Sequence, residues 1–289
     1  MAFTKKRIDV TLSLGTGTFG ESGANTVTLT GLRVQAMIRA VPGDSMPHAQ
    51  VRIYGLPLSM MNQLTSVGLI NASVRTNNKI LVAAGDEENG MASIYDGSIK
   101  ESWGQFEGMP DVTLNVIGVA GAAAALKPVS ALSLPGVADV ATIMRGLAQT
   151  MGMDFENNGV QVQLSNPYLP GTALMQVKAC ARAADIYYTI DRNVLAIWPK
   201  SGARRRAVDT PVISPETGMA GYPTFSSNAI QATTEFNHNI IPGGSVRIQS
   251  SLTPATGVWY VSEVVHTLES ETPNGQWFTH VTARPTNAS

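Results

Sequence analysis

Cysteine is almost absent from this 289-residue sequence, which contains a single one, Cys180. A lone cysteine excludes a disulfide within the chain, so the fold cannot depend on an oxidising compartment. The surrounding residues 175–185 have the composition of a helix, and we expect the Cys180 thiol to be buried and unreactive.

Charged residues are also scarce, at 14% of the chain against roughly 25% in a typical domain. The 20 basic and 21 acidic residues give a net charge of -1, which argues against a dedicated nucleic-acid-binding protein, since such proteins carry a basic excess. A chain so poor in charge must cover much of its surface, and burial in subunit contacts predicts an oligomer. The densest basic run, Arg204-Arg205-Arg206, is interpreted as a solvated linker, with contact to phosphates or to a charged partner as the alternative.

No hydrophobic run is long enough to cross a bilayer. The most apolar stretch, Val112–Leu126, contains Asn115 and several glycines and is too short for a transmembrane helix. Residues 1–14 have a basic start but neither an apolar core nor a cleavage pattern, so they do not predict a signal peptide. We therefore expect no membrane insertion, and synthesis in the cytoplasm.

Catalytic motifs are missing too. The four histidines show no metal-ligand spacing, and we expect structural or surface roles for His48, His238, His266 and His280, the last two on adjacent strands. The run Gly15–Gly20 matches GxGxxG but precedes a strand, so it cannot aim a helix N-terminus at a pyrophosphate. Gly244-Ser245-Val246 lacks the second glycine of a nucleophile elbow. We predict no catalytic, cofactor-binding or metal-binding residues, no cofactor, and no enzymatic activity.

Some residues leave alternatives open. Asp86-Glu87-Glu88 is read as an acidic hairpin tip, although a Ca²⁺ site or a carboxylate pair has the same composition. Glu101 and Glu107 stand near aromatic residues, which keeps a cell-wall glycoside hydrolase as one alternative function. Trp259 and Trp277 on neighbouring strands keep a carbohydrate-binding β module as another. We interpret all four tryptophans, which also include Trp103 and Trp198, as core or subunit-contact residues.

What the sequence does contain is turns and short alternating segments, with 27 glycines and 16 prolines. Residues 1–125 predict a first β module containing one short helix, Pro57–Ser66, and a strand at 94–103 interrupted by a bend at Gly97. Further alternating segments predict strands at 7–12, 27–40, 50–54, 80–84 and 111–119.

Residues 126–205 change character. Apolar residues at helical spacing predict a helix over Val137–Met151 that ends at Gly152, and a second helix capped by Thr172 that runs to about Asp185. Short strands are expected at 160–164, 186–190 and 194–198, the last two joined by a hairpin turn at Asp191–Asn193.

Residues 206–289 return to strands, at 230–236, 245–250, 258–268 and 276–282, with a hairpin turn at 272–275. The expected fold class is α+β, mainly β: two small β-barrel domains, 1–125 and 206–289, flank or enclose a small α+β domain at 126–205. We expect the two barrels to be quasi-equivalent.

Several runs together resemble the baseplate hub proteins of contractile-tailed bacteriophages. The runs that carry the resemblance are Gly218–Phe225, Phe236-Asn237, Pro242–Val246, Gly257–Val261, His266–Ser270 and Pro273–Thr279, with looser similarity at Gln50–Leu56, Met60–Leu64, Asp96–Ile99, Tyr188–Asp191 and Leu195–Pro199.

The resemblance implies a homotrimer in which each subunit supplies two barrels, so that three subunits form a ring of six. One side of this ring would match the hexameric tail tube, and the other would hold the trimeric spike, among other baseplate proteins. DNA would meet the protein only in transit through a central channel, for which a nearly neutral chain is suited because it does not retain phosphates. The expected location is the virion tail baseplate, after assembly in the host cytoplasm.

Overall fold

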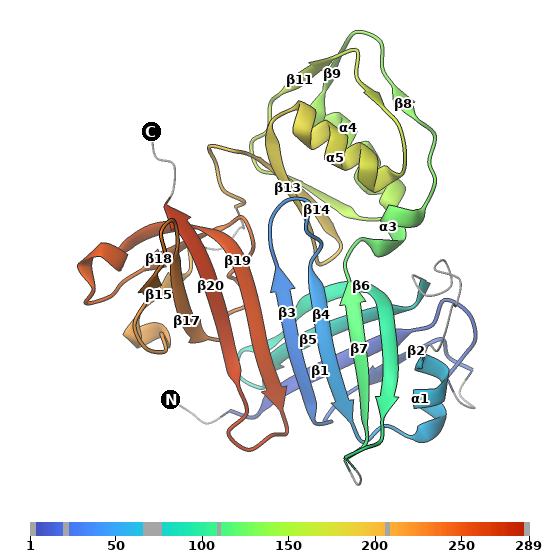
Figure 1. Cartoon of the computed structure of the whole chain (residues 1–289), viewed down its shortest axis with the longest axis vertical. Coiled ribbons are helices and arrows are strands. Elements are labelled where there is room, and N and C mark those ends of the chain that lie inside the picture. The colour runs from blue at the N-terminus through green and yellow to red at the C-terminus, as the bar shows by residue number, and fades with distance from the viewer. Residues whose placement is uncertain (1–3, 20–22, 66–76, 109–110, 206–208, 286–289) are drawn as a thin grey trace. The chain divides into compact units, whose positions relative to one another are not determined.

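The computed structural model describes residues 4–19, 23–65, 77–108, 111–205 and 209–285. The fold is α+β and mainly β, as the sequence predicts (Figure 1). Within these residues, no helix is long and apolar enough to cross a membrane.

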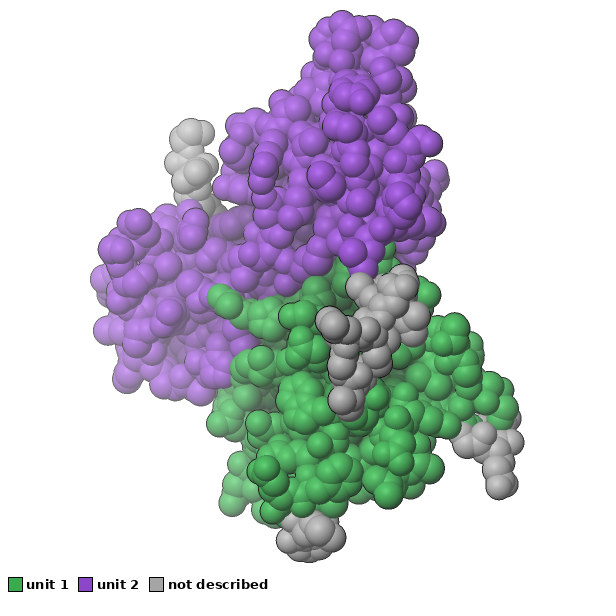
Figure 2. All heavy atoms as spheres, turned by 45° about the vertical axis from the view of Figure 1, so that its right-hand side comes forward, with its two compact units in different colours: residues 1–39, 47–123, 266–278 green, residues 40–46, 124–265, 279–289 purple. Residues whose placement is uncertain are grey.

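The chain forms two compact units, coloured green and purple in Figure 2. Unit 1 holds residues 1–39, 47–123 and 266–278, and unit 2 holds residues 40–46, 124–265 and 279–289. Strands β19 (Gly257–Ser270) and β20 (Trp277–Pro285) contribute residues to both units. The division into segments 1–125, 126–205 and 206–289, and their barrel form, stay predictions.

Unit 1 is built on an antiparallel sheet in the order β3-β4-β7-β6-β5-β1-β2, with β19 beside β3. Apolar residues recur at every second position, and this periodicity buries one face of each strand, as for Ile8, Val10 and Leu12. The strands are β1 (Lys6–Ser13), β2 (Thr26–Leu29), β3 (Val34–Ala40), β4 (His48–Tyr54), β5 (Lys79–Asp86), β6 (Gly90–Gln105) and β7 (Thr113–Val119).

The strands of unit 1 differ from expectation in two places. The segment expected as one strand over 27–40 is two strands, because the chain turns between β2 and β3, where Gly31 has a φ of 68°. The predicted interruption at Gly97 is wrong, since β6 runs through it and pairs first with β5 and then with β7. Gly97 serves close packing instead: a Cβ there would lie 2.4 Å from the hydroxyl oxygen of Tyr95.

Helix α1 (Leu58–Leu64) follows Pro57, as predicted. Met61 and Leu64 are buried, whereas Leu58, expected on the same face, is 58% exposed. The Ser102 hydroxyl on β6 donates a hydrogen bond to the carbonyl oxygen of Leu64, which fixes the end of the helix against the sheet. Ser66, the expected end of this helix, lies outside the described residues.

The helical part of unit 2 contains α3 (Ala122–Leu126), which begins in unit 1, then α4 (Val140–Met151) and α5 (Ala173–Ala183). The two longer helices accompany a three-stranded sheet in the order β10-β14-β13, in which β10 runs parallel to β14. The strands are β8 (Leu132–Ser133), β9 (Val137–Asp139), β10 (Asp154–Asn157), β11 (Gln163–Ser165), β12 (Tyr168–Leu169), β13 (Ile186–Asp191) and β14 (Val194–Pro199).

The two predicted helices are present, but the first begins later than expected. Val137 and Asp139 belong to β9, which pairs with β11, and the Asp139 carboxylate accepts a hydrogen bond from the Thr142 N–H at 2.8 Å. Because this side chain caps the helix, α4 starts at Val140. Thr172 caps α5, and Gly152 ends α4 in the left-handed conformation, both as predicted.

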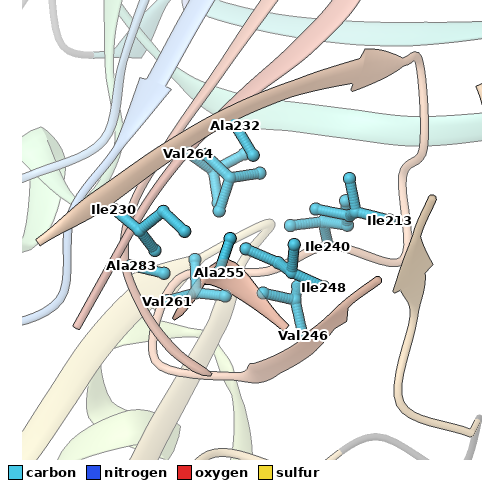
Figure 3. Close-up of a cluster of buried hydrophobic side chains, with 11 residues drawn as sticks. Ile213, Ile230, Ala232, Ile240, Val246, Ile248, Ala255, Val261, Val264 and Ala283 are labelled. Carbon is cyan, nitrogen blue, oxygen red and sulfur yellow. The ribbon is translucent and has the colours of Figure 1, made fainter. Parts of the chain in front are cut away.

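The strand-rich part of unit 2 encloses a cluster of buried aliphatic side chains (Figure 3). Ile230, Val246 and Val261 are fully buried in it, each from a different strand. The elements are β15 (Val212–Ile213), β16 (Thr224–Phe225), β17 (Ile230–Glu235), β18 (Ser245–Ile248), two short 3-10 helices (Pro215–Thr217 and Thr253–Ala255), and the unit 2 portions of β19 and β20. The strands predicted at 230–236, 245–250, 258–268 and 276–282 are confirmed.

Candidate assembly surfaces

The outer face of the unit 1 sheet carries a hollow of about 370 Å³, which we call the unit 1 hollow. Strand register places its side chains in two rows, of which the first crosses β3, β4 and β7 and the second also reaches β6. The first row is Met37, Gln50 and Ile117; the second is Gln35, Arg52, Asn115 and Trp103.

The unit 1 hollow combines apolar anchors with amides and almost no net charge. Trp103 is 41% exposed and Met37 is 38% exposed, which is high for side chains of this size. Its two charged lining residues, Arg52 and Glu269, have opposite signs. Depletion of charge together with exposed Trp and Met is typical of the centre of a protein–protein interface. The amides, the exposed Trp103 and Met37 and the nearly balanced charge of the described lining are suited to contact with another protein.

A second candidate surface lies in unit 2 beside β16, the last strand in the sheet order. Tyr222 is 69% exposed and Phe225 is 52% exposed. They belong to an uncharged run between Glu216 and Glu235. Exposed aromatic side chains without neighbouring charges are suited to a contact that excludes water.

Arg204 is buried in an ion cluster, which corrects its interpretation as part of a solvated linker. Its guanidinium donates to Asp191 at 2.8 Å and to Glu156 at 3.1 Å, with 4% of the side chain exposed. Its backbone N–H also donates to the Gly243 carbonyl oxygen at 2.7 Å, so the residue ties the helical part of unit 2 to the strand-rich part. Arg205 is exposed, as expected, and Arg206 lies outside the described residues.

The ion cluster is electrically balanced. Arg192 donates a further hydrogen bond to Asp191 at 3.0 Å, so two cations face two carboxylates. Burial alone would raise the pKa of Asp191, but the charges of Arg192 and Arg204 outweigh it and hold that pKa below its ordinary value. The charges of the cluster are thus paired with one another inside the fold.

Cys180 is fully buried on α5, as predicted. Burial raises the pKa of its thiol to about 11, so almost no reactive thiolate forms at neutral pH.

The acidic tip at Asp86 closes the β5–β6 hairpin, as predicted. The Asp86 carboxylate accepts hydrogen bonds from the backbone N–H groups of Glu88 and Asn89 at 2.9 and 2.7 Å. Hydrogen bonds from the Asn89 side chain, together with these, hold the pKa of Asp86 below its usual value. Since turn groups already occupy this carboxylate, the geometry favours a hairpin tip over a Ca²⁺ site.

His266 on β19 and His280 on β20 lie on adjacent strands, as predicted. His266 is buried, and the Nδ1 of His280 lies 3.0 Å from the Thr233 hydroxyl oxygen. Over the part of the chain that the structure describes, no three His, Cys, Asp or Glu side chains are grouped to hold a metal. Gly20, which ends the GxGxxG match, lies outside that part.

The structure gives no support to the glycan alternatives. The Glu101 Oε1 atom forms an ion pair with the Lys100 Nζ atom at 3.6 Å. Neither Glu101 nor Glu107 lines the unit 1 hollow. Trp277 is buried in unit 1, whereas Trp259 packs on the unit 2 cluster and donates its indole N–H to the Ala255 carbonyl oxygen at 2.9 Å. Local packing therefore accounts for both tryptophans.

A family model described as baseplate hub gp41 matches residues 7–278. The chain belongs to this baseplate hub family. It is thus a structural component of a phage tail, and the resemblance read from its sequence is confirmed. Comparison with curated protein sequences finds no match.

Solved structures of tail proteins share the fold of this hub family chain at low sequence identity. The 43 kDa tail protein of prophage MuSo2 from Shewanella oneidensis matches with a TM-score of 0.61 at 10% identity, over 97% of each chain. A tail protein from Neisseria meningitidis MC58 matches with a TM-score of 0.60 at 9% identity, over 96% of each chain. The E. coli c3393 protein, a type VI secretion system component, matches with a TM-score of 0.59 at 12% identity, over 89% of this chain and 74% of its own.

Sequence reasoning missed the unit 1 hollow, although part of its signal was present. The alternation of β3 marks Gln35 and Met37 as outward positions, and that of β4 marks Gln50 and Arg52. Only the register between strands shows that these side chains share two rows with Trp103.

Proposed function

We propose that three copies of this chain form a ring that adapts the hexameric tail tube to the trimeric spike. In this proposal the segments 1–125 and 206–289 are quasi-equivalent β barrels, so three chains present six similar modules. The segment 126–205 forms a middle domain toward the spike or the baseplate periphery. The observation that carries the proposal is the baseplate hub family match over residues 7–278.

The surfaces described above support an assembly role. The low share of charge, at 14%, and the exposed Trp103, Tyr222 and Phe225 favour burial against other proteins. Heterologous contacts that close into a ring are an ordinary way to bury such surfaces. We propose that tube, spike and other baseplate proteins are the partners, that assembly takes place in the host cytoplasm, and that DNA only passes through the central channel.

Native mass spectrometry tests this proposal directly. The chain has a mass of 30.6 kDa, and we expect a species of three times this mass, either alone or once candidate spike and tube proteins are added. A chain that stays monomeric with both partners present contradicts the ring.

We further propose that the role is purely structural. Zymography on peptidoglycan is expected to show no clearing. Clearing that is lost in Glu101→Gln would contradict this part of the proposal and leave the mass measurement unaffected.

A further inference from the structure

A pocket of about 380 Å³ opens in unit 2. Its lining residues differ from those of the unit 1 hollow, and so does its charge. Segments from five parts of the chain line it: β13, the turn after β14, the residues before β17, β19 and β20. The side chains that the argument uses are Tyr187, Lys200, Ser201, Asn228, Tyr260 and Arg284.

Among the described residues of the lining, the two charged ones are cations and none carries a carboxylate. Among the residues that the structure describes, Arg284 has no ion-pair partner. Lys200 forms an ion pair with Asp185 at the rim, and its Nζ lies 5.9 Å from the centre of the Tyr187 ring. The pocket therefore holds an uncompensated positive charge, which attracts an anion.

Neutral hydrogen-bond donors surround these cations. Ser201 contributes a hydroxyl and Asn228 an amide. Burial raises the pKa of Tyr260 to about 12, so its hydroxyl keeps its proton at neutral pH and can donate. Carboxylate oxygens accept several such bonds at once, and an arginine can bind both of them.

The two tyrosine rings that line the pocket, Tyr187 and Tyr260, are fixed by contact with each other and with Trp198. The Tyr187 and Tyr260 rings stack with centroids 6.2 Å apart, and the fully buried Trp198 lies 6.1 Å from Tyr187. Gly243 packs so closely on Trp198 that a Cβ there would lie 2.2 Å from the indole ring. Rings already fixed in this way lose little conformational entropy when a ligand binds.

We propose that this pocket binds a carboxylate from an acidic segment of a partner protein in the tail. Two cations are too few for a nucleic-acid groove, which carries basic residues along its length, and the chain as a whole has a net charge of -1. The volume suits one or two side chains, and the tyrosine rings provide apolar surface for the methylene groups of glutamate. This inference rests on the proposed function, since it names a contact within the tail assembly.

The test uses the full chain and three probes: a capped tetraglutamate peptide, the matched tetraglutamine peptide and inorganic phosphate. Trp198 reports binding by fluorescence because it lies behind Tyr187, and calorimetry gives the affinity. We expect tetraglutamate to bind in a salt-dependent manner and tetraglutamine not to bind. Arg284→Ala and Lys200→Ala should each weaken tetraglutamate binding at least tenfold, and Arg284→Gln should behave likewise if the alanine variant is unstable.

Arg247→Ala is the matched control, because Arg247 is an exposed arginine on β18 outside the pocket. Failure of tetraglutamate to bind, or equal binding by all variants, overturns the proposal. Binding of phosphate without tetraglutamate overturns it as well and assigns a phosphate site. The mass measurement of the ring is independent of these outcomes, so failure of the pocket is distinguishable from failure of the proposed function.

Discussion

At the scale of single residues, the guanidinium of Arg204 contacts carboxylates on two strands, Glu156 on β10 and Asp191 on β13. Removing one partner of a buried ion pair leaves the other charge without compensation, and this costs about 3–5 kcal/mol. Arg192 also contacts Asp191, so part of the compensation survives the loss of Arg204.

Arg204→Ala is therefore expected to lower the free energy of unfolding by about 3 kcal/mol, toward the lower end of that range. Denaturant unfolding followed by circular dichroism measures the change. The control is Arg205→Ala, whose exposed side chain predicts a change within about 0.5 kcal/mol. Equal effects of the two substitutions would contradict the role given to the ion cluster.

The lowered pKa of Asp191 makes stability depend on pH in a defined direction. A carboxyl group with a lower pKa in the folded state stabilises the fold above its unfolded pKa, near 3.8. This stabilisation is lost as the pH falls from that value through the folded pKa. We expect the stability difference between the native chain and Asp191→Asn to be constant from pH 7 to pH 5 and to shrink below pH 3.8.

Thermal unfolding of both proteins across this pH range tests the expectation. Asp154→Asn, at an exposed position in the same unit, is the control and should track the native chain. If the stability difference between the native chain and Asp191→Asn grows as the pH falls, the pKa of Asp191 is not lowered by folding and the prediction is wrong.

At the scale of elements, β6 depends on a tight fit around Tyr95. Gly97 and Gly118 both face this ring, and a Cβ at Gly118 would lie 2.8 Å from the Tyr95 hydroxyl oxygen. That hydroxyl is buried and has no hydrogen-bond partner among the residues that the structure describes. A buried polar group without a partner carries a desolvation cost of about 1–3 kcal/mol.

Tyr95→Phe is accordingly expected to leave stability unchanged or raise it by about 1 kcal/mol. Gly97→Ala should destabilise the chain, because its Cβ meets the hydroxyl, and the double variant should recover part of the loss. Denaturant midpoints of the four proteins form a double-mutant cycle. A strictly additive double variant would show that the Tyr95 hydroxyl is not what Gly97 accommodates.

Signals that act over a few residues could be read from the sequence. Thr172 starts α5 and Gly152 ends α4, because a cap depends only on its own turn. The hairpin after Asp191 was predictable because its two turn residues, Arg192 and Asn193, directly join two apolar runs.

Features that depend on distant partners could not be read in this way. Arg204 looked solvated because its partners precede it by 13 and 48 positions. The late start of α4 follows from pairing of β9 with β11, a contact that periodicity does not contain. The unit 1 hollow was missed for the same reason, since strand register brings its side chains together.

At the scale of the whole molecule, we expect substitutions in the unit 1 hollow to impair tail assembly while leaving the stability of the fold almost unchanged. Trp103→Ala is expected to change the free energy of unfolding by less than about 1 kcal/mol, because the side chain is 41% exposed. We expect it to lower plating efficiency at least tenfold when the variant complements a phage that lacks the hub gene.

Phe106→Ala is the matched control for this test, since Phe106 is 47% exposed and does not line the hollow. Full infectivity of Trp103→Ala, or an equal defect in both variants, would exclude the hollow as a contact surface.

The path of the chain through the two units has a consequence for biosynthesis. Residues 266–278 complete unit 1, although every other strand of that unit precedes residue 124. A ribosome must therefore translate the intervening residues 124–265 before β19 can cover the side of β3. Until then the nascent polypeptide exposes an unpaired strand edge, which invites aggregation and proteolysis. We therefore expect chains that stop before β19 to be more sensitive to proteolysis than chains that include it.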